Sequence, residues 1–149
     1  MMIDFLVNKR QWTCVYVCLS KSYKIIQRDL KKKGYNLKKF FFIDVMEKEP
    51  DKKIDNVMFI ESTSTLTQID MAITQVTQFT QNKGFVFVDT LEGLLINNTP
   101  NNLSNFIRSM VSKVAKYNSK VIVLTVGGVE ELLVNRISTF FDRLIKVEE

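Results

Sequence analysis

The feature that most constrains the fold is a regular alternation of short apolar runs with longer amphipathic stretches. Runs rich in β-branched and aromatic residues, bounded by polar residues or glycine, predict strands at residues 13–19, 40–45, 57–60, 85–89, 121–126 and 144–147. Strands that alternate with helices require crossover connections, which place the strands parallel in one sheet. We therefore predict a three-layer α/β fold, with a mostly parallel sheet and helices on both faces.

Apolar residues at three- and four-residue spacing predict the helices between these strands. Predicted helices cover residues 1–11, 66–81, about 103–117 and about 129–141, and a further helix is capped by Ser22 and ends at Gly34. Residues 46–56 and 97–102 are predicted loops. Gly127 and Gly128 predict a tight strand-to-helix turn, with small-anion binding as the alternative. No boundary, repeat or low-complexity segment interrupts the pattern, so we predict a single domain over 1–149.

Composition excludes several classes of protein. The hydrophobic fraction of 46% and the charged fraction of 25% are ordinary for a soluble globular chain. No apolar run approaches the roughly 18 residues of a membrane span, and the first ten residues do not resemble a signal peptide, so we expect a cytoplasmic protein without membrane contact. The absence of histidine excludes Ser/His/Asp and Cys/His catalysis.

The two cysteines, Cys14 and Cys18, lie four residues apart within one predicted strand. At that separation an extended chain holds them too far apart for a disulfide. With no histidine they provide too few ligands for a zinc site. We expect both to be small core residues, which favours a reducing compartment.

Asp89 is the most informative candidate for chemistry. In a parallel α/β sheet, ligands gather outside the carboxyl ends of the strands. Four apolar residues followed by Asp89 place a carboxylate there, where it could hold Mg²⁺, although such a residue also commonly caps the next helix or turn. A phosphate-binding loop of the form G-x-x-x-x-G-K-[ST] would be its companion. None of the five glycines begins such a loop.

A lysine-rich stretch gives a second candidate site. The net charge is +5, and much of the excess lies in residues 21–53. Such a stretch attracts polyanions, although lysine-rich helix faces are usually solvated surface. Tyr35 and Phe40 lie near it, but the sequence does not interleave aromatic residues with its cations. The candidate polyanion contacts are Lys31, Lys32, Lys33, Lys38 and Lys39.

The order of these motifs resembles archaeal RecA/KaiC-like P-loop ATPases. The run CVYVCLSKSYKIIQRDLKKKGYNLKKFFFID is similar to the family's second strand, helix and third strand, and VMFIESTSTLTQIDMAITQ to the Ser/Leu-Thr stretch that follows. FVFVDTLEGLLINNTPNNLSNFIRSMVSKV resembles the Walker B strand with its loop and helix, and VIVLTVGGVEELLVNRISTFFDRLIKVEE resembles the last strands and helix. The resemblance spans 1–149 and implies a RecA-like core.

Departures from the family pattern matter as much as the matches. The family's phosphate-binding loop and first strand precede the helix predicted at 1–11, so the resemblance implies that this chain begins too late to contain them. Ser20 and Lys21 stand where the family has catalytic glutamates, and only Asp89 with Thr90 matches the Mg²⁺-binding strand. Phosphoryl transfer depends on bound phosphates, a metal and a positioned nucleophile. We therefore expect no ATP hydrolysis by this chain alone and no bound cofactor.

Three functions follow as hypotheses. In the family the first strand lies inside the sheet, so its absence would bring its neighbours together or leave an edge unpaired. The first hypothesis is a non-catalytic regulatory or protein-interaction module that forms a homo-oligomer or docks on a RecA/KaiC-like ATPase. The second is a nucleotide sensor or ATPase subunit that uses Asp89 for Mg²⁺ with a phosphate loop supplied by a partner. The third is nucleic-acid binding through the lysines of 31–39.

Overall fold

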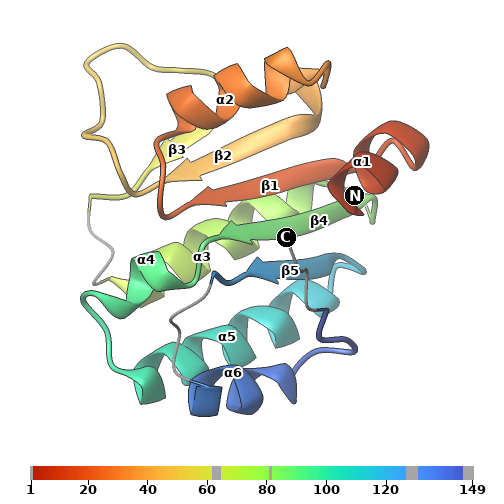
Figure 1. Ribbon diagram of the computed structural model, residues 1–149. Helices are drawn as coiled ribbons and strands as arrows, with labels where there is room; N and C mark the ends of the chain where they lie inside the picture. Colours follow the sequence, from red (N-terminus) through yellow and green to blue (C-terminus); the bar gives the residue numbers. More distant parts are fainter. Residues whose placement is uncertain (1, 62–64, 81, 127–130, 146–149) are drawn as a thin grey trace.

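The computed structural model describes residues 2–61, 65–80, 82–126 and 131–145, and it contains one five-stranded, all-parallel sheet (Figure 1). The strand order is β3-β2-β1-β4-β5. This arrangement confirms the predicted α/β class and the parallel sheet. The strands are β1 (Thr13–Cys18), β2 (Phe40–Asp44), β3 (Val57–Phe59), β4 (Gly84–Asp89) and β5 (Lys120–Leu124).

Helices cover both faces of the sheet, which confirms the three layers (Figure 1). One face packs against a short α1 (Met2–Asp4), which continues as the π-helix η1 (Phe5–Lys9), and against α2 (Tyr23–Lys32). The other face packs against the remaining α-helices, and two 3₁₀ turns, η2 (Leu37–Lys39) and η3 (Gln78–Thr80), lead into strands. These α-helices are α3 (Leu66–Thr77), α4 (Glu92–Leu95), α5 (Pro100–Ala115) and α6 (Glu131–Ser138).

Strand β1 lies at the centre of the sheet and is buried on both sides. Side chains alternate across a strand, so Val15 and Val17 join the core beneath α3 and α5, while Cys14 and Cys18 join the core beneath α2. Both cysteines are free and fully buried. Their predicted role as small core residues is therefore confirmed.

The face beneath α2 is lined by aromatic rings from three neighbouring strands. The ring of Tyr16 in β1 lies 5.1 Å from that of Phe87 in β4 and 5.9 Å from that of Phe42 in β2. Phe40 and Phe42 stack with their centroids 6.1 Å apart. Rings at these separations add to the hydrophobic stabilisation of the sheet.

The turns that enter the strands share one backbone conformation. A left-handed residue precedes each strand, and the five are Gln11 (φ 57°), Gly34 (φ 86°), Asn56 (φ 64°), Asn82 (φ 65°) and Asn118 (φ 55°). Glycine and asparagine favour this region, and at a helix end it reverses the chain within one or two residues. We call the rim formed by these turns the amino edge of the sheet. In the described part of the chain, no residue outside the amino edge has this conformation.

Several predicted boundaries were wrong. Helix α3 ends at Thr77 and passes into η3, so it is shorter than the predicted 66–81. Helix α5 begins at Pro100, inside the predicted loop 97–102, because the Thr99 hydroxyl accepts a hydrogen bond from the Asn102 amide at 3.1 Å and caps it. Helix α4 was not predicted.

The predicted last strand, 144–147, is not confirmed. Residues 144 and 145 are irregular, and 146–147 lie outside the described residues, as does the predicted turn at Gly127 and Gly128. Among the described residues, no helix is both long and apolar enough to cross a bilayer.

Candidate functional site

The carboxyl ends of the three central strands bring the predicted site residues together. Cys18 is in register with Asp44 of β2 and with Asp89 of β4. We call this rim, formed by the ends of the strands and the residues that follow them, the carboxyl edge. Asp89 and Thr90 lie at its centre, next to Ser20, as the sequence predicted for a strand-end site.

The Asp89 carboxylate is already engaged within the fold. Its Oδ2 accepts a hydrogen bond from the Tyr16 hydroxyl at 2.5 Å. Burial, together with this hydrogen bond to the carboxylate, raises the pKa of Tyr16 above its ordinary value, so the phenol stays protonated and remains a donor. One of the two carboxylate oxygens that could bind a metal ion is therefore already hydrogen-bonded to a side chain of the neighbouring strand β1.

Sequence reasoning did not find the contact between Tyr16 and Asp89. In the observed register Tyr16 lies opposite Phe87, two residues before Asp89, so Tyr16, Phe87 and Asp89 share the sheet face beneath α2. Even spacing from Cys14 and Cys18 places Tyr16 on that face, but the sequence does not specify which strand lies beside β1. The strand order supplies the missing information.

Thr90 and Ser20 also bind each other. Their hydroxyls lie 2.6 Å apart, and the Thr90 amide donates to the Ser20 Oγ at 3.2 Å. Thr90 is buried, and the peptide bond between Asp89 and Thr90 is cis. These two hydroxyls are therefore linked across the carboxyl ends of β1 and β4.

Asp44, at the end of β2, has a structural role. Its side chain is fully buried, and it accepts hydrogen bonds from the Tyr23 amide at 2.9 Å and from the Met46 amide at 2.6 Å. Tyr23 is the first residue of α2, so Asp44 caps that helix from a neighbouring strand, where a negative charge is favourable. Burial of the Cys18 thiol raises its pKa, and the negative charges of Asp44 and Asp89 raise this pKa further, so this cysteine is not a reactive thiolate.

Glu92 is a further acidic residue of the carboxyl edge, and it too bonds the backbone. Its Oε1 accepts from the Val126 amide at 2.7 Å, which links α4 to the segment after β5, while its Oε2 is buried without a partner. Within the described residues, no cluster of three or more Asp, Glu, Cys or His side chains could hold a metal ion. The carboxyl edge is thus a set of internal hydrogen bonds, with Asp89 as its only central carboxylate close to solvent.

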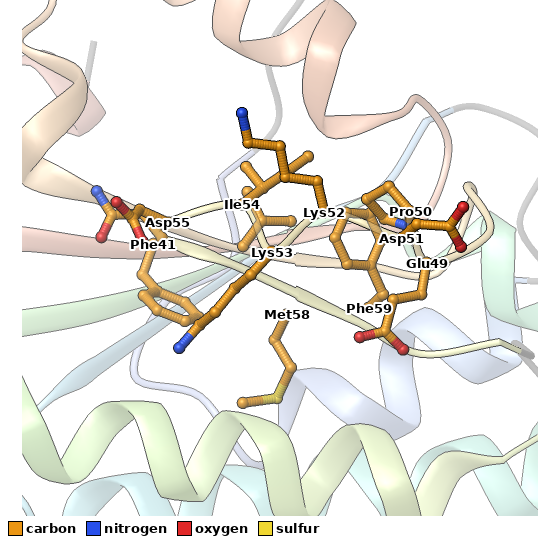
Figure 2. A pocket seen from close by; sticks show the side chains of 12 residues that line it. Phe41, Glu49, Pro50, Asp51, Lys52, Lys53, Ile54, Asp55, Met58 and Phe59 are labelled. Atoms are coloured by element: carbon orange, nitrogen blue, oxygen red, sulfur yellow. The ribbon is translucent and has the colours of Figure 1, made fainter.

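Two surface hollows lie away from these residues. One, of about 780 Å³, is formed by Phe41 and the segment 49–59 beside the edge strand β3 (Figure 2). Met58 points from β3 toward α3, but the charged side chains Glu49, Lys52 and Lys53 spread outward and do not converge on one point (Figure 2). Without convergent polar groups, this hollow does not form a small-molecule site.

The second hollow, of about 570 Å³, lies between α3 and α5. Asp70 of α3 is 7% exposed, and its Oδ2 binds the Lys113 Nζ at 2.6 Å and the Ser109 hydroxyl at 3.2 Å. Its Oδ1 is buried without a partner. The ion pair joins two helices on the face remote from α2, which is a structural role.

The lysine-rich stretch lies at the opposite rim from Asp89. Lys31 and Lys32 end α2, Lys33 follows, and Lys38 and Lys39 lie in η2, immediately before β2. Since β2 begins at the amino edge, these lysines and the Asp89–Thr90 pair cannot contact one small ligand together. They form two separate candidate sites.

Comparisons of this chain with models of protein families and with curated proteins find no match.

Proposed function

We propose that this chain is a non-catalytic interaction module, related to RecA/KaiC-like ATPases, that associates through the open edge of β5. The open edge is the observation that carries the proposal. In the described part of the chain β5 pairs with β4 alone, so one side of its backbone has no strand partner. An unpaired strand edge is a ready template for pairing with another chain.

Exposed apolar side chains in the last quarter of the chain support association. Leu124 at the end of β5 is 41% exposed and Val126 is 58% exposed. Leu132 of α6 and residues Leu144 and Ile145 are also exposed, so the last quarter of the chain holds five of the large apolar side chains that face water. Exposed apolar surface commonly marks an interface.

The hydrogen bonding of the carboxyl edge supports the non-catalytic part of the proposal. The Asp89 carboxylate accepts a hydrogen bond from the Tyr16 hydroxyl, and the hydroxyls of Ser20 and Thr90 are hydrogen-bonded to each other. Among the described residues the position of the family's catalytic carboxylates is held by Ser20 and Lys21. A nucleotide would have to displace existing hydrogen bonds here and would gain no carboxylate base.

Size-exclusion chromatography with light scattering tests the association. We expect a dimer or larger species whose proportion rises with concentration, and we expect the double variant Leu124→Lys/Val126→Lys to be monomeric, because lysine on an edge strand opposes pairing. Met71→Lys on α3 is the matched control, since Met71 is 64% exposed and lies on the remote face. A wild-type chain that stays monomeric at millimolar concentration would contradict self-association through β5.

Thermal unfolding with and without Mg-ATP tests the non-catalytic part separately. A ligand that binds only the native state must raise the melting temperature. We expect no rise at millimolar Mg-ATP. A rise that disappears in Asp89→Asn would show instead that this chain is a nucleotide sensor.

A further inference from the structure

The segments that enter four of the five strands carry charge of one sign. Residues 8–12, 31–39, 82–83 and 116–120 lead into β1, β2, β4 and β5, the last segment including the first residue of β5, and together they hold ten lysines and arginines and no aspartate or glutamate. Five of these cations are the lysines of 31–39 named above. The other five, which the sequence did not single out, are Lys9, Arg10, Lys83, Lys116 and Lys120.

Contacts along the amino edge place these segments side by side. The Thr13 amide donates to the Lys83 carbonyl at 2.8 Å, the Lys39 Nζ donates to the Gln11 carbonyl at 3.4 Å, and the Asn118 side chain donates to that of Asn82 at 3.4 Å. Neighbouring strands are about 4.8 Å apart, so the row from β2 to β5 spans about 14 Å. A row of this length can follow several phosphates of a nucleic-acid strand.

The cations of this row are available to a ligand. Nine of the ten are exposed, Lys39 being half-buried, and none forms an ion pair within the described residues. Lys31 and Lys32 also complement the dipole of α2, which accounts for cations at a helix end. The dipole supplies only about half a negative charge per helix end, so it offsets a small part of this row. Lys83 and Lys120 lie beyond the helix ends altogether.

The segments that enter the strands also carry aromatic residues. Trp12, Tyr35 and Tyr117 come from three different entering segments, and each is partly exposed. Phe79, in η3 just before β4, is 78% exposed. Cations that follow a phosphate backbone, combined with aromatic faces on which bases stack, are the features that bind single strands without sequence preference.

We propose that the amino edge binds single-stranded nucleic acid, with phosphates along the cation row and bases against the exposed aromatic rings. The aromatic residues favour a single strand over a duplex, because unpaired bases are free to stack on them. The site is independent of β5 association and lies at the opposite rim from Asp89.

Two readouts on the full chain test the proposal. Fluorescence anisotropy with a labelled 20-nucleotide dT strand should show binding that weakens with salt, with a slope of log affinity against log salt of about −3 for four phosphates. Trp12 is the only tryptophan, so its emission reports directly on the site. We expect dT to quench it by stacking.

Matched variants locate the site. Lys38→Glu/Lys83→Glu should weaken dT binding about tenfold or more, whereas Lys21→Glu/Lys48→Glu, which changes the net charge equally at the carboxyl edge, should leave affinity within about twofold. Phe79→Ser should weaken binding several-fold without lowering the melting temperature, because the ring is mostly in water. Circular dichroism of each variant checks that it is folded.

Three outcomes would overturn the proposal. The first is no binding of dT at 50 mM salt by the folded chain. The second is an equal loss of dT affinity in the two double variants, which would show that dT is attracted by the net charge of the chain and not by the amino edge. The third is binding of heparin, duplex DNA or anionic lipid vesicles at least as tightly as dT, which would assign the cation row to another polyanion.

Discussion

The two rims of the sheet differ in how they use their charged residues, although the same five strands form both. The carboxyl edge, over residues 19–22, 44–48, 60–61, 89–92 and 125–126, holds five acidic and two basic residues. Four of the five entering segments of the amino edge, 8–12, 31–39, 82–83 and 116–120, hold ten basic residues and no acid, and the fifth, 53–56 before β3, holds one of each. Asp44, Asp89 and Glu92 accept hydrogen bonds from the fold itself. Nine of the ten cations of the four entering segments are exposed, and none forms an ion pair within the described residues.

This difference separates stability from binding in the molecule. Removing a charged group that is hydrogen-bonded to buried partners lowers stability, because those partners are left without a hydrogen bond from either the protein or water. A solvated cation affects folding little and acts mainly on a charged ligand. Substitutions at the carboxyl edge should therefore destabilise the chain, and substitutions at the amino edge should spare stability.

The largest effect should come from Asp44→Ala. Removing this carboxylate leaves the Tyr23 and Met46 amides without their acceptor, and we expect the free energy of unfolding to fall by about 3 kcal/mol in urea titrations. Asp44→Asn keeps one acceptor oxygen and should cost clearly less. Equal stability of Asp44→Ala and the wild type would show that Asp44 does not hold α2 in place.

Gly93→Ala should have the next largest effect. A Cβ at Gly93 would overlap the Leu19 carbonyl oxygen, which belongs to the backbone and cannot easily move, so we expect a loss of about 2 kcal/mol. Gly34→Ala provides the comparison at the amino edge. Its Cβ would meet no atom within 4 Å, but the left-handed backbone disfavours alanine, so a loss of about 1 kcal/mol is expected. The reverse order of the two losses would contradict the close approach of α4 to β1.

Tyr16→Phe should change the response to alkaline pH. Because the folded chain raises the pKa of Tyr16, the unfolded chain releases this proton above about pH 10 while the folded chain keeps it. The contribution of Tyr16 to the free energy of unfolding is therefore fully present below about pH 10. Above that pH this contribution falls by about 1.4 kcal/mol for each unit of pH. Urea titrations at pH 9 to 11 should show a shallower decline in Tyr16→Phe. Parallel declines in the two proteins would exclude a buried, protonated Tyr16.

The smallest effect on stability should come from the amino edge. Replacing Lys31, Lys32 and Lys33 together by Gln removes three exposed side chains without ion pairs in the described structure, and each change should alter the free energy of unfolding by less than about 0.5 kcal/mol. A cooperative loss of several kcal/mol would place these lysines among the groups that hold α2, and would remove the contrast between the two rims.

Sequence periodicity predicted the layers and the parallel sheet because buried strands and amphipathic helices have different repeats. The clustering of Asp89, Thr90 and Ser20 was also accessible, since parallel strands end at one rim. The bond from Tyr16 to Asp89 was not, because it depends on which strand lies beside β1. The presence of Trp12, Tyr35 and Tyr117 at the same edge as the lysines was missed for the same reason: these residues are far apart along the chain, and only the fold brings their segments to one edge.

Cys14 and Cys18 give the chain an internal probe of its own opening. Both thiols lie in the central strand with no exposed surface, so a thiol reagent can modify them only when β1 separates from its neighbours. With excess reagent, the modification rate of the unlabelled wild-type chain would measure how often the whole sheet opens. A ligand that binds at either rim would then slow the modification of Cys14 and Cys18, although it does not contact them.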